Sequence, residues 1–378
     1  MMERLARGGL WLAPVLMASA CTAGAIGGAN GSTGTSTGSG VQSPGSGGAS
    51  AQGTGAGAGS TGSGQGMPVA TADGGLAWLG DSGAPAVVLS PASRIARLSH
   101  TQLLNSYRDL LGITDVSAAD TILTPDAVVG FDNEGDALYV TDALWANLQQ
   151  VAELFAHTVA TTPTLLASLV PANAPTDATG KATAFLQAFG LNAYRRPLTS
   201  AEVQTYLTLF NQGLTLVGGT DAFAAGVELV LQAFLQSPYF IYRMELSDQV
   251  VGGRIPLSDY EAATKLSYAL TNSTPDSTLL AAAAKGRVAN PTDLATQAVR
   301  LLATPAATAA VEHFHFQMYR FGVYDGITKD STVYPQFTAA TGPAMRQESL
   351  LFLDWIFAGN MGVADVYTSP VSFVNDLL

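Results

Sequence analysis

The stretch FAAGVELVLQAFLQSPYFIY, residues 223–242, decides the fold of this chain. It is apolar almost all round, and its polar exceptions, Glu228, Gln232 and Gln236, recur every four residues. On an α-helix that spacing gathers the three side chains into one narrow stripe. A helix that is apolar on its other faces lies at the centre of its domain. The Ser-Pro pair at 237–238 predicts that the helix ends or kinks there, because proline disfavours helical backbone at the preceding residue.

Three capping boxes predict further helices on both sides of this stretch. Each has Ser or Thr followed three residues later by Glu or Gln, and each precedes an apolar run at helical spacing. They lie at 99–102, 199–202 and 258–261, and the first run stops at Gly112. Alternating strand patterns with hairpin turns are nearly absent from the sequence. We therefore expect an all-α body of roughly ten to twelve helices.

The bulk composition narrows the class of protein. The chain has 378 residues, of which 47% are hydrophobic and 12% charged, and its formal net charge is −12. A chain of this length normally divides into two or more domains. Its acidic balance repels phosphate backbones, which argues against nucleic acid as a partner. No uncharged apolar run is long enough for a membrane-spanning helix, so the sequence predicts none.

The first twenty residues predict export. Arg4 and Arg7 precede an apolar stretch at 9–17, and small residues follow at 18–20, which is the layout of a signal peptide. Cys21, the only cysteine of the chain, comes next. Two interpretations follow. Ordinary signal peptidase would release a soluble protein with a free N-terminal cysteine. The stretch also resembles a bacterial lipoprotein signal, in which the cysteine is acylated, although Ala18 replaces the usual leucine.

The single cysteine favours the lipoprotein interpretation. A free thiol on an exposed tail in an oxidising compartment would form intermolecular disulfides, whereas a lipidated thiol is capped. Two or more acyl chains give stable membrane anchoring. We therefore predict a lipoprotein signal peptide at 1–20 and lipidation at Cys21. The protein is expected to be exported and anchored in the bacterial cell envelope, in the outer membrane.

Residues 21–78 predict a flexible Gly/Ser/Thr-rich linker. Gly, Ser, Thr and Ala dominate this stretch, and large side chains are scarce. Such a composition cannot bury enough apolar surface to offset its ordering entropy, so we expect a disordered tether. A Gly/Ser coil of this length has an end-to-end distance of about 40 Å. A glycosylated stalk is the alternative that this composition leaves open.

Four successive regions carry a likeness to known proteins. They are RIARLSHTQLLNSYRDLLGI with GFDNEG (94–135), NAYRRPLTSAEVQTYLTLF with GVELVLQAFLQSPYFIYRMEL (192–246), LSDYEAATKLSYALTNSTPDSTLLAAAAKGRV with TPAATAAVEHFHFQMYRFG (257–322), and YPQFTAATGPAMRQESLLFLDWIFAGN with DVYTSPVSFVNDLL (334–378). In this order they resemble a group of planctomycete-type domains of unknown function, which often occur with cytochrome c domains in secreted proteins. Family members usually carry a tryptophan where this chain has Thr271.

The resemblance implies a domain order rather than an activity. We expect a first helical domain at 79–172, a second at 178–250, a third at 254–323, and the start of a fourth, incomplete domain at 334–378. Similar proteins continue beyond this fourth region. The apolar helix within it should therefore expose a patch around Leu351, Trp355 and Phe357.

The histidines offer one weak metal candidate. Covalent haem needs Cys-x-x-Cys-His, so this sequence predicts no covalently bound cofactor, and any cytochrome would be a separate partner. His313 and His315 point away from each other on a helix. His315 and Met318 share a face, and His and Met together can ligate haem iron. We favour packing of an aromatic helix, because further metal ligands are missing, and we expect no metal site.

The stretch DNEGD at 132–136 invites comparison with a calcium-binding loop. Its glycine falls at loop position four rather than six, and position twelve carries no glutamate. Asp and Asn side chains also cap turns and helix starts. A helix-entry loop rich in capping groups therefore explains the stretch better than calcium does.

Arg195 and Arg196 precede Pro197 and a predicted helix. Two neighbouring guanidinium groups can clamp an anionic ligand or a carboxylate of another domain. Structural ion pairing, with Glu228 or Glu245 as partner, is the interpretation that we favour. Arg195, Arg196 and Glu228 remain the candidate ligand contacts of the folded part, and the catalytic residues, if there are any, are unknown.

These observations favour an envelope-anchored helical lipoprotein that binds or scaffolds. The resemblance links it to a redox system with a separate cytochrome or another envelope protein as partner, and the lipid anchor makes the membrane a further partner. The alternative is an extracellular enzyme that acts on a polymer or metabolite. Its site would lie between helical subdomains, near Glu228 and the two arginines.

Overall fold

The computed structural model of the chain describes residues 68–70, 76–78, 94–126, 130–135, 137–251 and 254–378. The chain divides into two units, residues 1–84 and 85–378. In the first unit, strand β1 (Pro68–Ala70) pairs antiparallel with β2 (Leu76–Trp78). The predicted signal peptide, Cys21 and most of the predicted linker lie outside the described residues.

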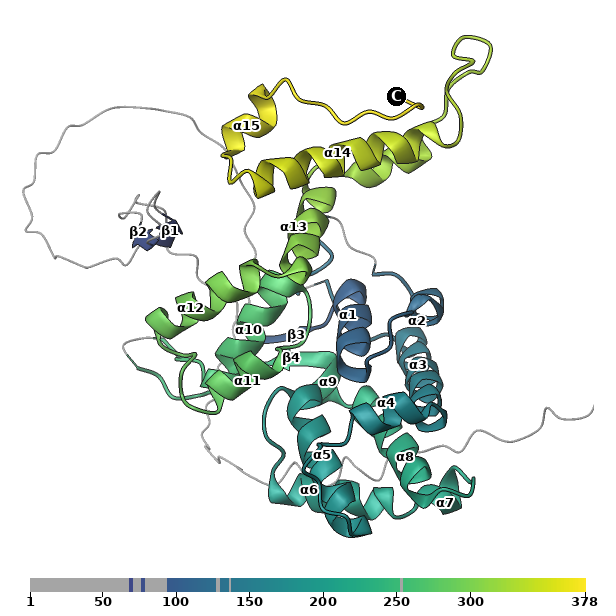
Figure 1. Cartoon of the computed structure of the whole chain (residues 1–378), viewed down its shortest axis with the longest axis vertical. Helices are drawn as coiled ribbons and strands as arrows, with labels where there is room; N and C mark the ends of the chain where they lie inside the picture. The colour runs from purple at the N-terminus through teal and green to yellow at the C-terminus, as the bar shows by residue number, and fades with distance from the viewer. Residues whose placement is uncertain (1–67, 71–75, 79–93, 127–129, 136, 252–253) are drawn as a thin grey trace, which may run out of the picture. The chain divides into compact units, whose positions relative to one another are not determined.

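The second unit is built of helices, which confirms the all-α prediction (Figure 1). Its described residues form fifteen α-helices and one 3-10 helix, more than the ten to twelve expected. The surplus comes from short helices that carry too few residues for a periodic pattern, such as α7 (Gly213–Leu216) and α9 (Pro238–Ile241).

The first nine helices surround one hydrophobic core. They are α1 (His100–Leu111), α2 (Ser117–Ile122), α3 (Asp142–Thr161), α4 (Pro163–Ser168), α5 (Ala178–Tyr194), α6 (Ser200–Phe210), α7, α8 (Ala222–Gln236) and α9. Helix α8 is central, as expected: it contacts α3, α5, α6 and α7, and Leu231 and Phe234 are fully buried. It ends at Gln236, and Ser237 then caps α9, in which Pro238 is the first residue.

The three predicted capping boxes all form. Ser99, Thr199 and Ser258 each accept a hydrogen bond from the backbone N–H three residues later, and that residue's side chain accepts one in return. They begin α1, α6 and α10 (Asp259–Thr271). Helix α1 ends at Leu111, and the next residue, Gly112, has a φ of 68°, the left-handed conformation that favours glycine.

Two three-residue strands connect distant parts of the chain. Strand β3 (Ile95–Arg97), just before α1, pairs antiparallel with β4 (Tyr242–Met244), just after α9. The register sets Ala96 opposite Arg243. This short sheet carries the end of the α9 segment alongside the start of α1.

A smaller hydrophobic cluster forms among α10, α11 (Ser277–Ala283) and α12 (Pro291–Leu302). Helix α10 also joins the first core, because Tyr268 is buried there. The Tyr268 hydroxyl lies 2.8 Å from Ser106 Oγ of α1. Helix α10 therefore connects the two hydrophobic clusters.

The C-terminal elements are α13 (Pro305–Met318), the 3-10 helix η2 (Phe321–Gly326), α14 (Thr341–Ala358) and α15 (Val363–Thr368). Leu351 and Phe357 on α14 are 40% and 42% exposed, and the contiguous apolar patch expected there stays a prediction. Trp355 is half-buried and packs against Phe352 and Phe373. None of the described helices is both long and apolar enough to cross a membrane.

Candidate functional site

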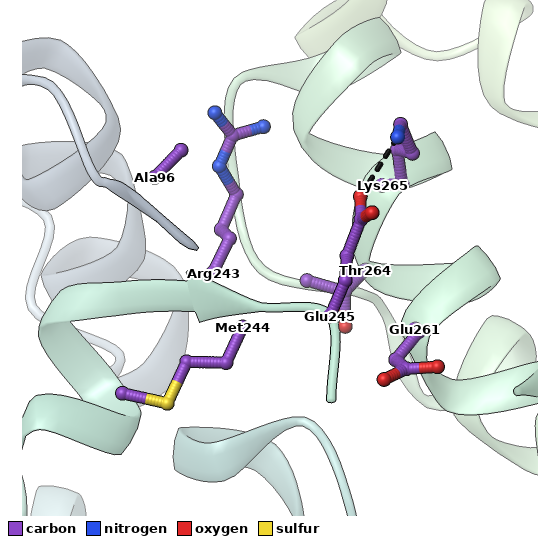
Figure 2. A pocket seen from close by; sticks show the side chains of 7 residues that line it. All are labelled: Ala96, Arg243, Met244, Glu245, Glu261, Thr264 and Lys265. Atoms are coloured by element: carbon purple, nitrogen blue, oxygen red, sulfur yellow. Dashed lines mark hydrogen bonds and ion pairs between the residues drawn. The ribbon is translucent and has the colours of Figure 1, made fainter. Parts of the chain in front are cut away.

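A pocket of about 230 Å³ lies beside the short β3–β4 sheet, between β4 and α10. Ala96 comes from β3, and Arg243, Met244 and Glu245 come from β4 and the residue after it. Helix α10 supplies Glu261, Thr264 and Lys265, which share one face because they lie three and four residues apart. Figure 2 shows Arg243 and the Glu245–Lys265 pair around this space.

Arg243 is the unusual residue of the pocket. Its side chain is half-buried, and its Nε is buried without a hydrogen-bond partner. Its guanidinium lies 5.6 Å from the ring centre of Tyr268, so a cation–π contact partly offsets the burial. Burial lowers the pKa of Arg243 below its ordinary value, and the nearby charge of Arg195 acts in the same direction, whereas Tyr268 and Glu245 act to raise it. Arginine nevertheless stays protonated in proteins, so this is a partly desolvated cation.

No carboxylate of the described residues lies within ion-pair distance of the Arg243 guanidinium. A partly buried charge without such a partner loses hydration that nothing in the protein fully replaces. The planar fork of N–H donors on arginine matches a carboxylate or a phosphate group. The pocket is therefore suited to take an anionic group against Arg243.

Glu245 and Lys265 form an ion pair in the same pocket, with 2.7 Å between Lys265 Nζ and Glu245 Oε1. Glu245 is the more buried partner, with 18% of its side chain exposed against 51% for Lys265. Glu245 follows β4 directly, so the strand fixes its position, whereas the lysine reaches across from α10.

Glu261 has a structural role in the pocket. Its carboxylate accepts hydrogen bonds from the backbone N–H groups of Ser258 (2.8 Å) and Ser247 (2.9 Å), and from both of their hydroxyl groups. Burial opposes ionisation of Glu261, but these bonds outweigh it and lower the pKa of this carboxyl below its ordinary value. Glu261 therefore stays ionised and ties the chain after β4 to the start of α10.

Arg195 bonds the backbone of its own chain. Its side chain is 3% exposed and donates hydrogen bonds to the backbone carbonyl oxygens of Tyr239 (2.6 Å), Phe240 (3.1 Å) and Tyr242 (2.7 Å). It also donates to the Tyr268 hydroxyl at 3.3 Å. The cation thus satisfies the carbonyls at the end of α9, where helices leave carbonyl groups without intrahelical partners.

Arg196 forms the structural ion pair that the sequence suggested, but with a different partner. Its two terminal nitrogens donate to the two carboxylate oxygens of Glu202, at 3.0 and 2.8 Å. Its guanidinium also lies 4.7 Å from the ring centre of Tyr239. The expected partners, Glu228 and Glu245, were wrong, because the Glu202 of the adjacent capping box is nearer along the chain.

Glu228 lies on α8 and pairs with the exposed His157 of α3 at 3.1 Å. Within the described part of the chain, no hydrogen bond or ion pair joins Glu228 to Arg195 or Arg196. The structure thus does not bring together the three residues that the sequence suggested as one ligand site.

His313 and His315 have separate surroundings. His313 Nε2 lies 2.9 Å from Asp132 Oδ2, which connects the loop at 130–135 to α13. His315 Nδ1 bonds the carbonyl oxygen of Val311, and its ring contacts three aromatic neighbours, Phe314, Tyr319 and Phe357. These contacts agree with the aromatic-helix interpretation, and Met318 is 49% exposed.

Asp132 also explains the DNEGD stretch, in the part of it that the structure describes. Besides His313, its carboxylate accepts a hydrogen bond from the hydroxyl of Ser99, the residue that caps α1. No group of three or more His, Cys, Asp or Glu residues that could hold a metal ion occurs among the described residues.

Sequence reasoning missed Arg243. The one available signal was a cation in the middle of the apolar run YFIYRMEL at 239–246. A charged residue in such a run is rarely buried unless it is paired, so its position suggests either a structural partner or a ligand.

Three regions of the chain match models of protein families. Three domains of unknown function lie in this sequence. Residues 96–161 match PSD3, a protein of unknown function (DUF1587), residues 181–245 match PSD5 (DUF1595), and residues 257–378 match PSD4 (DUF1592). No curated protein and no solved structure matches the chain.

The pocket draws on all three matched regions. Ala96 belongs to the PSD3 match, Arg243 and Glu245 to the end of the PSD5 match, and Lys265 to the PSD4 match. The PSD4 match also spans both the third and the fourth region of the sequence comparison. The site thus depends on the combination of these domains within one chain.

Proposed function

We propose that this protein is an exported, membrane-anchored binding protein that holds a small anionic ligand against Arg243. The observation that carries the proposal is the partly desolvated Arg243 guanidinium, which lines a pocket and has no carboxylate within ion-pair distance among the described residues. An anion bound there would supply the missing countercharge through two parallel hydrogen bonds. The pocket volume of about 230 Å³ admits a small metabolite rather than a polymer.

A binding role also agrees with the rest of the site. Glu261 is occupied by its hydrogen bonds, and Thr264 donates its hydroxyl to the carbonyl oxygen of Tyr260 at 2.8 Å. The described pocket residues include no histidine, and the Lys265 amine is held in an ion pair by Glu245, so we assign no catalytic roles among them. The extracellular enzyme of the sequence analysis therefore gains no specific support.

The anchor of this proposed protein is Cys21. The signal-peptide layout and the single cysteine support lipidation there, and the outer membrane is the proposed location. Labelling of cells with radioactive palmitate should mark the wild-type chain but not Cys21→Ser. Equal labelling of both would contradict the anchor and leave the pocket unaffected. The redox link, with a separate cytochrome or envelope protein as partner, rests on the sequence resemblance alone.

Calorimetric titration of the full chain in detergent tests the anion site. Acetate, propionate and phosphate serve as probes, and at least one should bind with heat that saturates. Arg243→Met should weaken that binding by about tenfold or more, because a charged hydrogen bond contributes about 1.5–3 kcal/mol. Arg243→Lys should give an intermediate loss, since lysine keeps the charge without the fork.

Lys285→Met is the matched control. It removes one positive charge from an exposed position outside the pocket, so the long-range electrostatic effect is similar and the affinity should stay within twofold. If no probe binds the wild type, or if Arg243→Met binds as tightly as Lys285→Met, the anion site is refuted.

A further inference from the structure

The carboxylates of the pocket are not explained by a simple anion. Arg243 and Lys265 bring two positive charges to its lining, and Glu245 and Glu261 bring two negative ones. A bare anion seated against Arg243 would therefore lie in a small space with two carboxylates, which repel it. A pocket selected only for an anion would be expected to lack them.

Glu261 does not need a ligand. Backbone N–H groups of Leu246, Ser247 and Ser258 and two serine hydroxyls already donate to its two oxygens. A carboxylate has about four acceptor positions, so Glu261 is saturated by its own protein. Glu261 therefore lines the pocket but offers a ligand no free acceptor position.

Glu245 differs. Lys265 Nζ donates to its Oε1 at 2.7 Å, whereas Oε2 receives no hydrogen bond from any residue that the structure describes. The lysine is half-exposed, so solvent screens its charge and weakens the ion pair. The free Oε2 leaves Glu245 able to accept a further hydrogen bond. Figure 2 shows Glu245 and Arg243 as neighbouring side chains of the same pocket. An ammonium group in that pocket would find Glu245 as its acceptor.

We propose that the ligand is a small zwitterion, a free α-amino acid with a short side chain. Its carboxylate binds the Arg243 fork and its ammonium group binds Glu245. This rests on the anion site proposed above and adds the second contact. The ligand is neutral overall, and so is the formal charge of the pocket, so binding adds no net charge to a partly desolvated space. The volume of about 230 Å³ limits the side chain to a small one.

Three small probes separate the two contacts: propionate, L-alanine and ethylamine. Propionate offers only the carboxylate, ethylamine only the ammonium group, and L-alanine both. Titration of the full chain should show L-alanine binding about tenfold or more tightly than propionate, because it adds one charge-assisted hydrogen bond. Ethylamine alone should bind more weakly than either.

Two variants sharpen the test. Glu245→Gln should reduce the affinity for L-alanine to that for propionate, and should leave propionate binding unchanged or tighter. Lys265→Met removes the competitor of the ligand ammonium, so it should strengthen L-alanine binding and weaken propionate binding. Glu153→Gln, which removes an exposed carboxylate of α3, is the control and should change neither affinity beyond twofold.

The outcomes distinguish this inference from the anion site. If propionate binds in an Arg243-dependent way and L-alanine binds no more tightly, the zwitterion is refuted and the anion site stands. If Glu245→Gln leaves the preference for L-alanine intact, the proposed role of Glu245 is wrong. If acetate, propionate, phosphate and L-alanine all fail to bind the wild-type chain, both proposals fail together.

Discussion

Two arginines have nearly equal geometry toward one ring and opposite surroundings. The guanidiniums of Arg195 and Arg243 both lie 5.6 Å from the ring centre of Tyr268. Arg195 is enclosed by backbone carbonyl groups, and both of its terminal nitrogens donate hydrogen bonds. Arg243 faces a pocket with a buried Nε that has no partner. The comparison teaches that the structural arginine is the buried one whose terminal nitrogens bond carbonyl groups, whereas the candidate ligand-binding arginine is half-buried and has a donor without a partner.

The largest expected effect is that of Arg195→Met on stability. Methionine fills similar space but leaves the carbonyl groups of Tyr239, Phe240 and Tyr242 without their donor, and buried unpaired carbonyls are costly. We expect the free energy of unfolding to fall by about 3 kcal/mol or more. Urea denaturation followed by circular dichroism measures it.

Arg108→Met provides the control for this change. Arg108 lies on α1, and its side chain is 41% exposed beside Asp109, so its loss should cost less than about 1 kcal/mol. If Arg195→Met and Arg108→Met unfold at the same urea concentration, the hydrogen bonds from Arg195 to the carbonyl groups contribute nothing to stability and the comparison fails.

The second expected effect is that of acid on stability. It should act through Glu261 of the pocket rather than through Arg195. The hydrogen bonds to Glu261 lower its pKa in the folded protein below its unfolded value of 4.5. Its stabilising contribution is therefore fully present above pH 4.5 and is lost as the pH falls through the folded pKa. Arg195 contacts no carboxylate among the described residues, so the stability that its hydrogen bonds contribute should not depend on pH over this range.

Urea midpoints at pH 7, 4 and 3 measure the acid effect. Glu261→Gln should be less stable than the wild type at pH 7, and the difference should shrink toward pH 3. The acid loss will not vanish, because Asp132, Glu202 and Asp276 also have lowered pKa values. A difference that stays constant from pH 7 to pH 3 would mean that the charge of Glu261 does not stabilise the fold.

The third expected effect concerns the ring that both arginines share. Tyr268→Phe keeps the ring, and with it both cation–π contacts, but removes the hydroxyl that accepts from Arg195 and lies 2.8 Å from Ser106 Oγ. We expect a loss of about 1 kcal/mol in unfolding free energy. Binding of propionate at Arg243 should stay within twofold in titration. A large loss of binding would show that the two arginines are coupled through the hydroxyl.

The sequence predicted what depends on near neighbours along the chain. The capping boxes at Ser99, Thr199 and Ser258 need only residues three apart, and all form. The central position of α8 follows from its apolar faces, and Ser237-Pro238 marked its end. These features depend on backbone geometry that repeats within one or two turns, so a short window of sequence contains the necessary information.

The candidate site could not be predicted in the same way. Arg243 meets Ala96 only because two strands of three residues pair across 146 intervening positions, and strands that short carry no periodic signal. Arg195 and Glu228 looked like a pair by charge, but Arg195 found carbonyl groups and Glu228 found His157. Which charges meet is a tertiary property, and charge type alone does not determine it.

The smallest expected effect is that of Arg243→Met on stability, and it completes the comparison. Removing Arg243 leaves no described carboxylate or carbonyl without a donor, and it eliminates a partly desolvated cation beside Arg195. Replacing such a charge by an apolar side chain of similar volume is often neutral or stabilising. We expect the free energy of unfolding to change by less than about 1 kcal/mol in ligand-free protein. The same variant should lose the increase in melting temperature that saturating propionate gives the wild type. A loss of stability as large as that of Arg195→Met would mean that Arg243 is also structural, and the pocket would then need another explanation.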